Sequence, residues 1–210
     1  MSTSVDDVDP GISEAPPRFK PQYRHRATWI ETALSSAIGL WASFVLSLDA
    51  LLIAANPEEV LSCDINATIS CGAVARTWQA ELFGFPNAFL GLMAEPVIIT
   101  VAVASIAGVV FPRWFMIAAQ VVSSIGFIFA MWLFYQSYFV ILRLCPYCLL
   151  ITVTTTLIFF AFTRVNILEG NFGESLRRKL DRPLRVYHVE LIIAVVFLAI
   201  LAAMVVFKYL

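Results

Sequence analysis

The stretch "RLCPYCLL" at residues 143–150 separates two long apolar runs and contains two of the four cysteines of the chain. Proline is tolerated in the first turn of a helix, so Pro146 predicts that a helix begins around Cys145. Cys145 and Cys148 are then one turn apart on the same helix face. Helix N-termini favour thiolates, which are the nucleophiles of thiol–disulfide exchange. The stretch therefore predicts a redox pair, whose chemistry depends on the compartment that it faces.

The composition of the whole chain is that of an integral membrane protein. Of 210 residues, 60% are hydrophobic and 14% are charged, and the mean hydropathy is +0.83, whereas soluble domains carry about 25% charged residues. Five segments are apolar and long enough, or nearly so, to cross a bilayer: 29–55, 87–111, 114–142, 145–162 and 187–207. We therefore expect an all-α polytopic membrane protein, with a four-helix transmembrane bundle and a fifth transmembrane helix.

The regions outside these spans divide the chain further. Residues 1–26 are acidic, then proline-rich, then basic, which predicts a disordered cytoplasmic tail before a single five-helix domain at 27–210. A loop at about 56–86 contains the other two cysteines, Cys63 and Cys71. Within this loop, Val74, Trp78 and Leu82 recur every fourth residue, which predicts a short amphipathic half-helix.

The distribution of Lys and Arg predicts the orientation, since positive residues favour the cytoplasmic side. With the N-terminus inside, the outer connections contain only Arg76, Arg143 and Lys208 of the fourteen Lys and Arg residues. The C-terminus and all four cysteines then lie at the outer surface. Disulfides form and persist on the outer side of a bacterial inner membrane and in the endoplasmic reticulum lumen.

Two cysteine pairs at one membrane surface leave three interpretations open. They are a redox relay, a static disulfide or pair of buried thiols, and a zinc site of four thiolates. The seven residues between Cys63 and Cys71 exceed the two to four that zinc sites usually have between paired ligands. A relay needs an electron acceptor, and the sequence has no Rossmann glycine pattern and no haem-attachment motif. A quinone dissolved in the bilayer fits best, bound in an apolar pocket beside Cys148.

Three segments together resemble the vitamin K epoxide reductase family in its bacterial form: "CDINATISCGAVARTW" (63–78), "GFPNAFLG" (84–91) and "RLCPYC" (143–148). The resemblance covers roughly residues 30–165, and the order of the two cysteine pairs is specific to this family. It implies a membrane dithiol:quinone oxidoreductase in the bacterial inner (plasma) membrane, with a menaquinone- or ubiquinone-type acceptor. Such an enzyme reoxidises an extracytoplasmic thioredoxin-like protein and so supports disulfide formation in exported proteins.

The resemblance also implies roles for five residues. Cys63 and Cys71 match the loop pair that takes electrons from the partner. Cys145 matches the cysteine that exchanges with this pair, through Cys71, and Cys148 matches the cysteine next to the quinone. Asn87 matches the asparagine that donates a hydrogen bond to a quinone carbonyl. The alternative for Asn87 is N-capping of the second span, which Asn does well.

Two departures from the family limit what is carried over. Animal members have a tyrosine where this chain has Thr152, so epoxide reduction is an alternative function, as is a non-catalytic protein stabilised by zinc or a disulfide. Many bacterial members continue into a fused thioredoxin-like domain after the fifth helix, whereas this sequence ends at Leu210. We therefore expect the electron donor to be a separate protein, and we expect no nucleic-acid partner and no metal.

Four acidic residues lie in or near the apolar segments and the cysteine loop. Glu95 is either a proton relay for quinone reduction or a protonated carboxyl bonded to a neighbouring helix. Asp49 and Glu190, near span ends, are expected to be poorly placed for the chemistry. Asp64 follows Cys63 directly and is expected to close the loop or dock a partner, because an unpaired carboxylate there would disfavour the Cys63 thiolate.

Overall fold

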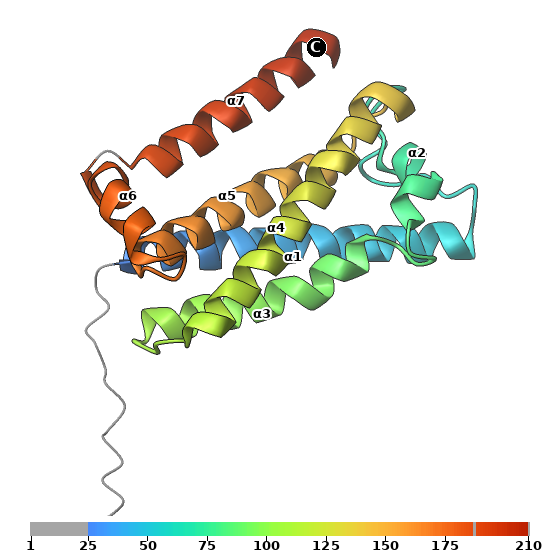
Figure 1. The fold of residues 1–210 in the computed structure, drawn as a ribbon. Helices are drawn as coiled ribbons and strands as arrows, with labels where there is room; N and C mark the ends of the chain where they lie inside the picture. Colours follow the sequence, from blue (N-terminus) through green and yellow to red (C-terminus); the bar gives the residue numbers. More distant parts are fainter. Residues whose placement is uncertain (1–24, 187, 210) are drawn as a thin grey trace, which may run out of the picture.

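The computed structural model describes residues 25–186 and 188–209 of the chain. All but the last two residues of the predicted tail at 1–26 lie outside the described residues. The described elements are helical (Figure 1): α1 (Arg26–Ala55), α2 (Cys71–Ala75), η2 (Trp78–Glu81), α3 (Ala88–Ile106), α4 (Arg113–Tyr135), η3 (Gln136–Ile141), α5 (Pro146–Leu168), α6 (Glu174–Val186) and α7 (Val189–Tyr209).

Five of the described helices are long and apolar enough to cross a membrane: α1, α3, α4 continued by η3, α5 and α7. The predicted multi-pass membrane fold is confirmed. Helix α3 ends five residues earlier than predicted, and Gly108, just beyond it, adopts a left-handed φ of 98°. Helix α5 continues six residues further than predicted, because its polar residue Asn166 is fully buried and hydrogen-bonded inside the protein.

Helices α1 and α5 pack against each other in the middle of the bundle, with α3 on α1 and α4 on α5. Helix α7 lies outside these four helices, against α5 (Figure 1). Contact between α1 and α3 is close where Gly91 faces Ser43, because a Cβ on Gly91 would lie 2.1 Å from Ser43 Oγ. The predicted four-helix bundle with a fifth helix is thus present.

The largest apolar core cluster lies at the end of the bundle that contains the start of α1 and the end of α5. Trp29 packs edge-on against Phe162, with ring centroids 5.6 Å apart, and Met116 and Val165 fill the same cluster. Beside it, Asn166 donates to the carbonyl of Met116 at 3.3 Å and accepts from Asn171 at 2.8 Å. This end is therefore held by tight apolar packing and by a satisfied polar network.

The predicted amphipathic half-helix is divided into two short helices, α2 and η2. Thr77 interrupts it with an extended backbone, at φ −91° and ψ 149°. The Thr77 hydroxyl donates to the carbonyl of Val74 at 2.7 Å, which ends the first turn. Side chains of this type compete with the helical hydrogen-bond pattern, and the apolar spacing of Val74 and Trp78 does not reveal that competition.

Candidate functional site

The loop that contains Cys63 and Cys71 folds onto the start of α5. The Ser70 N–H donates to the Leu144 carbonyl at 2.9 Å, and the Leu144 N–H donates to the Thr68 carbonyl at 2.8 Å. These two bonds form a parallel bridge between Ile69 and Leu144. Cys71 follows Ile69 by two residues, and Cys145 follows Leu144 directly.

Three of the four cysteines consequently belong to one buried cluster, and the fourth packs against it. Cys63, Cys71 and Cys145 are 6%, 1% and 2% exposed, and half-buried Cys148 packs on the cluster from α5. The structure thus brings all four predicted cysteines together at one end of the bundle. This end is opposite to the core cluster around Trp29 and Phe162.

The two cysteine pairs differ in redox state. Cys63 and Cys71 form a disulfide, with their Cα atoms 5.6 Å apart, whereas Cys145 and Cys148 are free thiols. Cys145 is the N-cap of α5, and its Sγ accepts a hydrogen bond from the Cys148 N–H at 3.2 Å. The predicted helix start, with Pro146 in the first turn, is confirmed. The loop disulfide also removes two of the four thiolates that the zinc alternative requires.

Asp64 organises the loop around the disulfide. Its carboxylate accepts hydrogen bonds from the Ser70 hydroxyl at 2.6 Å, the Gly72 N–H at 2.9 Å and the Leu61 N–H at 3.0 Å. Burial alone would raise the pKa of Asp64, but these donors and the positive charge of Arg76 lower it below its ordinary value. The carboxylate is therefore a permanent acceptor that closes the loop, as one of the two sequence interpretations expected.

Asn87 is at the N-cap position of α3, but its side chain makes no capping hydrogen bond. Instead, Asn87 Nδ2 donates to the Gln79 carbonyl at 2.6 Å, which links the start of α3 to η2. Its Oδ1 atom is buried and has no hydrogen-bond partner among the described residues. The capping alternative is therefore wrong, and the proposed role toward a quinone stays a prediction.

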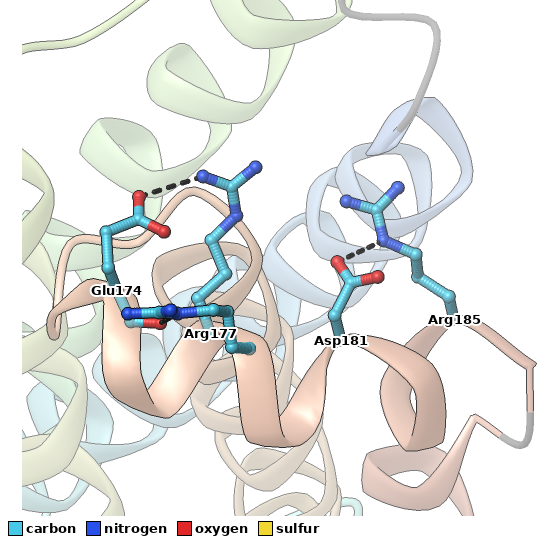
Figure 2. A pocket seen from close by; sticks show the side chains of 5 residues that line it. Glu174, Arg177, Asp181 and Arg185 are labelled. Carbon is cyan, nitrogen blue, oxygen red and sulfur yellow. Dashed lines mark hydrogen bonds and ion pairs between the residues drawn. The ribbon is translucent and has the colours of Figure 1, made fainter.

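Two surface hollows have charged side chains in their lining, the second together with apolar ones, and neither is lined by Cys148, beside which the sequence predicted a quinone pocket. One follows α6, the basic segment after α5, and is lined by charged side chains, among them two ion pairs, Arg177 with Glu174 at 2.9 Å and Arg185 with Asp181 at 2.6 Å (Figure 2). The other lies over the cysteine loop, between the end of α1 and Arg76. The first is a charged surface of a helix far along the chain from the cysteines. The second is lined by Asp64 and Arg76 of the cysteine loop but by none of the cysteines.

Sequence reasoning missed one residue of this site. Asp49 was expected to be poorly placed for chemistry, yet its Oδ2 lies 3.8 Å from Cys63 Sγ, and the side chain is only 7% exposed. The expectation failed because the loop folds back over the last turns of α1, where Leu46 and Ile53 pack against the cysteines. The spacing of Leu46, Asp49 and Ile53 places them on one helix face, and this was the available signal.

A multi-pass helical bundle with a disulfide and a Cys-x-x-Cys pair packed together at one end defines a membrane thiol–disulfide oxidoreductase. Comparison with family models gives a match to the Vitamin K epoxide reductase family over residues 30–163. The chain belongs to this family, which confirms the family resemblance seen in the sequence. A search of curated proteins gives no match.

Proposed function

We propose that the protein is a dithiol:quinone oxidoreductase of a bacterial plasma membrane. It reoxidises a separate extracytoplasmic thioredoxin-like protein and passes the electrons to a menaquinone- or ubiquinone-type acceptor. The observation that carries the proposal is the bridge between Ile69 and Leu144, which packs the loop disulfide against Cys145. Two cysteine pairs in one cluster allow electrons to pass between them by thiol–disulfide exchange, without a further carrier.

The first half of the cycle takes place at the loop pair. A thiolate of the partner attacks the Cys63–Cys71 disulfide and forms a mixed disulfide with Cys63, and Cys71 leaves as a thiolate. The second thiol of the partner then attacks this mixed disulfide, and Cys63 is released. The partner has gained a disulfide, and the loop pair has gained two electrons.

The second half passes these electrons to α5. Cys71 attacks Cys145 in the oxidised form of the Cys145–Cys148 pair, which releases Cys148. Cys63 then attacks Cys71, restores the loop disulfide and releases Cys145. The two thiols of α5, as seen in the structure, transfer two electrons and two protons to the quinone substrate and become a disulfide.

Asn87 has hydrogen-bonding capacity that suits a quinone. One proton of its amide is used by the Gln79 carbonyl, which leaves a second N–H to donate, and its Oδ1 is unpaired among the described residues. Such an amide donates to a quinone carbonyl and accepts from the hydroxyl of the quinol product. Donation to an oxygen on which negative charge develops favours reduction.

The orientation is proposed from the charges. Arg26, Arg113 and the basic helix α6 all lie at the end of the bundle opposite to the cysteines. Positive residues favour the cytoplasmic side of a membrane, so the N-terminus is cytoplasmic, and the cysteines and the C-terminus face outward. This side is oxidising, as disulfide transfer to exported proteins requires.

The test is a set of four single Cys→Ala variants, assayed for quinone reduction with a thioredoxin-like dithiol protein and with dithiothreitol. Loss of Cys145 or Cys148 abolishes turnover with both donors. Loss of Cys63 or Cys71 abolishes turnover with the protein donor and leaves part of it with dithiothreitol, which reaches the α5 pair directly. Equal activity of all four variants would refute the proposal. A wild type that reduces a quinone epoxide but not a quinone would favour the alternative function, epoxide reduction.

A further inference from the structure

Asp49 contacts the loop disulfide from the last turns of α1. One carboxylate oxygen of Asp49, Cys63 Sγ and Cys71 Sγ all lie within 4.8 Å of one another. The contact with Cys63 Sγ, at 3.8 Å, is the only hydrogen-bonding contact of the Asp49 side chain among the described residues. All three residues are buried, so water has little access to the sulfur atoms.

The other charged groups near Asp49 have different functions. The charge of Asp64 acts on Asp49, but the Asp64 carboxylate is occupied by three donors from the loop. Arg76 donates to the carbonyls of Pro57 and Glu59 on the loop surface.

The remaining titratable groups come from the helices packed on α1. Glu95 of α3 lies against Gly39, ten residues and about 15 Å along the helix from Asp49. At the cysteine end of α5, Cys145 and Cys148 are thiols, and Tyr147 packs beside the cluster. Among the described residues, Asp49 is the carboxyl group in contact with a reacting sulfur.

The chemistry of the contact depends on a proton. A disulfide sulfur has no hydrogen to donate, so Asp49 and Cys63 share a hydrogen bond only when one of them is protonated. A hydrogen bond between them therefore requires the proton on the carboxyl group in the disulfide form and on the thiol in the reduced form. Because the relay must both release Cys63 and use it as a nucleophile, this proton has to move in each cycle.

We propose that Asp49 is a catalytic residue that exchanges a proton with Cys63 during thiol–disulfide transfer. The inference rests on the proposed function for the direction of the cycle, but not for the contact itself. When the partner breaks its mixed disulfide with Cys63, the Cys63–S bond cleaves, and the leaving sulfur takes the proton of Asp49. When Cys63 later attacks Cys71 in the Cys71–Cys145 disulfide, Asp49 takes the proton back.

Each of these steps is balanced. In the second, one S–S bond forms between Cys63 and Cys71 and one breaks between Cys71 and Cys145, the electron pair leaves with Cys145, and the proton passes from Cys63 to Asp49. No other oxidant or base is required. Proton transfer of this kind contributes about 10²- to 10⁴-fold to the rate of a reaction.

The experiment follows the release of Cys63 in the absence of the quinone reaction. In the full chain with Cys71, Cys145 and Cys148 all replaced by alanine, Cys63 is first converted to a mixed disulfide with glutathione, and release of its thiol by dithiothreitol is followed by stopped flow between pH 5 and 9. Asp49→Asn is compared with the parent, with the conservative Asp49→Glu, and with Ser47→Ala as a control for a buried change in the same part of α1. Rates are divided by the concentration of dithiothreitol thiolate at each pH.

At low pH the parent is faster than Asp49→Asn, on the order of 10²-fold. This ratio falls as the pH rises, because an ionised Asp49 has no proton to donate. Ser47→Ala follows the parent, and Asp49→Glu retains the pH-dependent rate. A ratio that is the same at every pH, or equal to one throughout, would overturn the inference, since a purely structural role has no pH signature.

Two outcomes separate this inference from the proposed function. If the wild type does not reduce a quinone but the ratio still changes with pH, the proposed function fails and the role of Asp49 stands. If Asp49→Asn does not form the mixed disulfide at Cys63, Asp49→Glu gives the same test. If the rate of Asp49→Glu, divided by the concentration of dithiothreitol thiolate, does not vary with pH, the inference is overturned.

Discussion

Replacement of Gly91 by alanine tests the close packing of α1 and α3. The added Cβ would lie 2.1 Å from Ser43 Oγ and 2.8 Å from Ser43 Cβ, so one helix must move by about 1 Å or more to restore an ordinary contact. Ser43 is only 1% exposed, and turning its hydroxyl away does not remove the clash, because its Cβ is also too close. Overpacking of this kind costs about 1–3 kcal/mol.

For a chain of this length, that cost lowers the midpoint of thermal unfolding by about 2–12 °C. Asn87 lies one turn before Gly91, at the start of α3, so a displaced helix also moves the amide that we assign to the quinone. We expect Gly91→Ala to raise KM for the quinone more than it lowers kcat. The assays are thermal unfolding in detergent and steady-state quinone reduction.

The matched rescue is Ser43→Gly, which removes both atoms that the new methyl group would meet. The double variant Gly91→Ala, Ser43→Gly should regain most of the lost stability, although Ser43→Gly alone is destabilising. Strict additivity of the two single changes, or a Gly91→Ala protein with an unchanged unfolding midpoint, would refute this reasoning about the helix contact.

Three further predictions concern buried polar groups. Asp64→Asn should lower the free energy of unfolding by about 1.5–3 kcal/mol at pH 7. Because the folded-state pKa of Asp64 is lowered, the stability difference between wild type and variant has its full size above about pH 4 and disappears as the pH falls below it. Chemical unfolding at each pH measures this difference. Asn166→Ala should cost about 1–3 kcal/mol for each buried group left unpaired, including Asn171 Nδ2, without changing the rate of loop-disulfide reduction. Glu190→Ala removes the ion-pair partner of the mostly buried Arg164 but leaves the charge of Glu31 acting on it. It should cost about 1.5–3 kcal/mol, with faster proteolysis between α6 and α7. Resistance equal to the wild type would show that this ion pair does not hold α7.

The membrane spans could be predicted from the sequence, because the bilayer requires a minimum length of apolar helix, which hydropathy measures directly. The residues at which the spans end could not be predicted in this way. Asn166 looks like the end of a span in the sequence, yet it lies in the interior of α5, because Met116, Gln120 and Asn171 provide partners that are distant in the sequence. The helical shape of α6 was likewise not predicted, since its charged residues show only that it lies at the surface.

The sequence predicts that the two cysteine pairs lie at the same end of the bundle, but not the contacts between them. An even number of crossings between the loop and the Cys-x-x-Cys stretch places both pairs at one end of the bundle, and the structure has them there. The bridge between Ile69 and Leu144 and the contact between Asp49 and Cys63 were not predictable in this way. The bridge consists of backbone hydrogen bonds, which no residue pattern specifies, and for Asp49 the helix-face spacing shows only on which side of α1 it lies.

The central claim is that electrons pass from the loop pair to α5 through Cys71 and Cys145. The most direct measurement is disulfide trapping in a variant with Cys63→Ala and Cys148→Ala, oxidised in the membrane and mapped by mass spectrometry. A nearly complete Cys71–Cys145 disulfide is predicted, because the bridge between Ile69 and Leu144 holds the backbone just before Cys71 against the backbone just before Cys145. The complementary variant with Cys71→Ala and Cys148→Ala should form little Cys63–Cys145 disulfide, and a preference for Cys63 over Cys71 in this pair of variants would contradict the account.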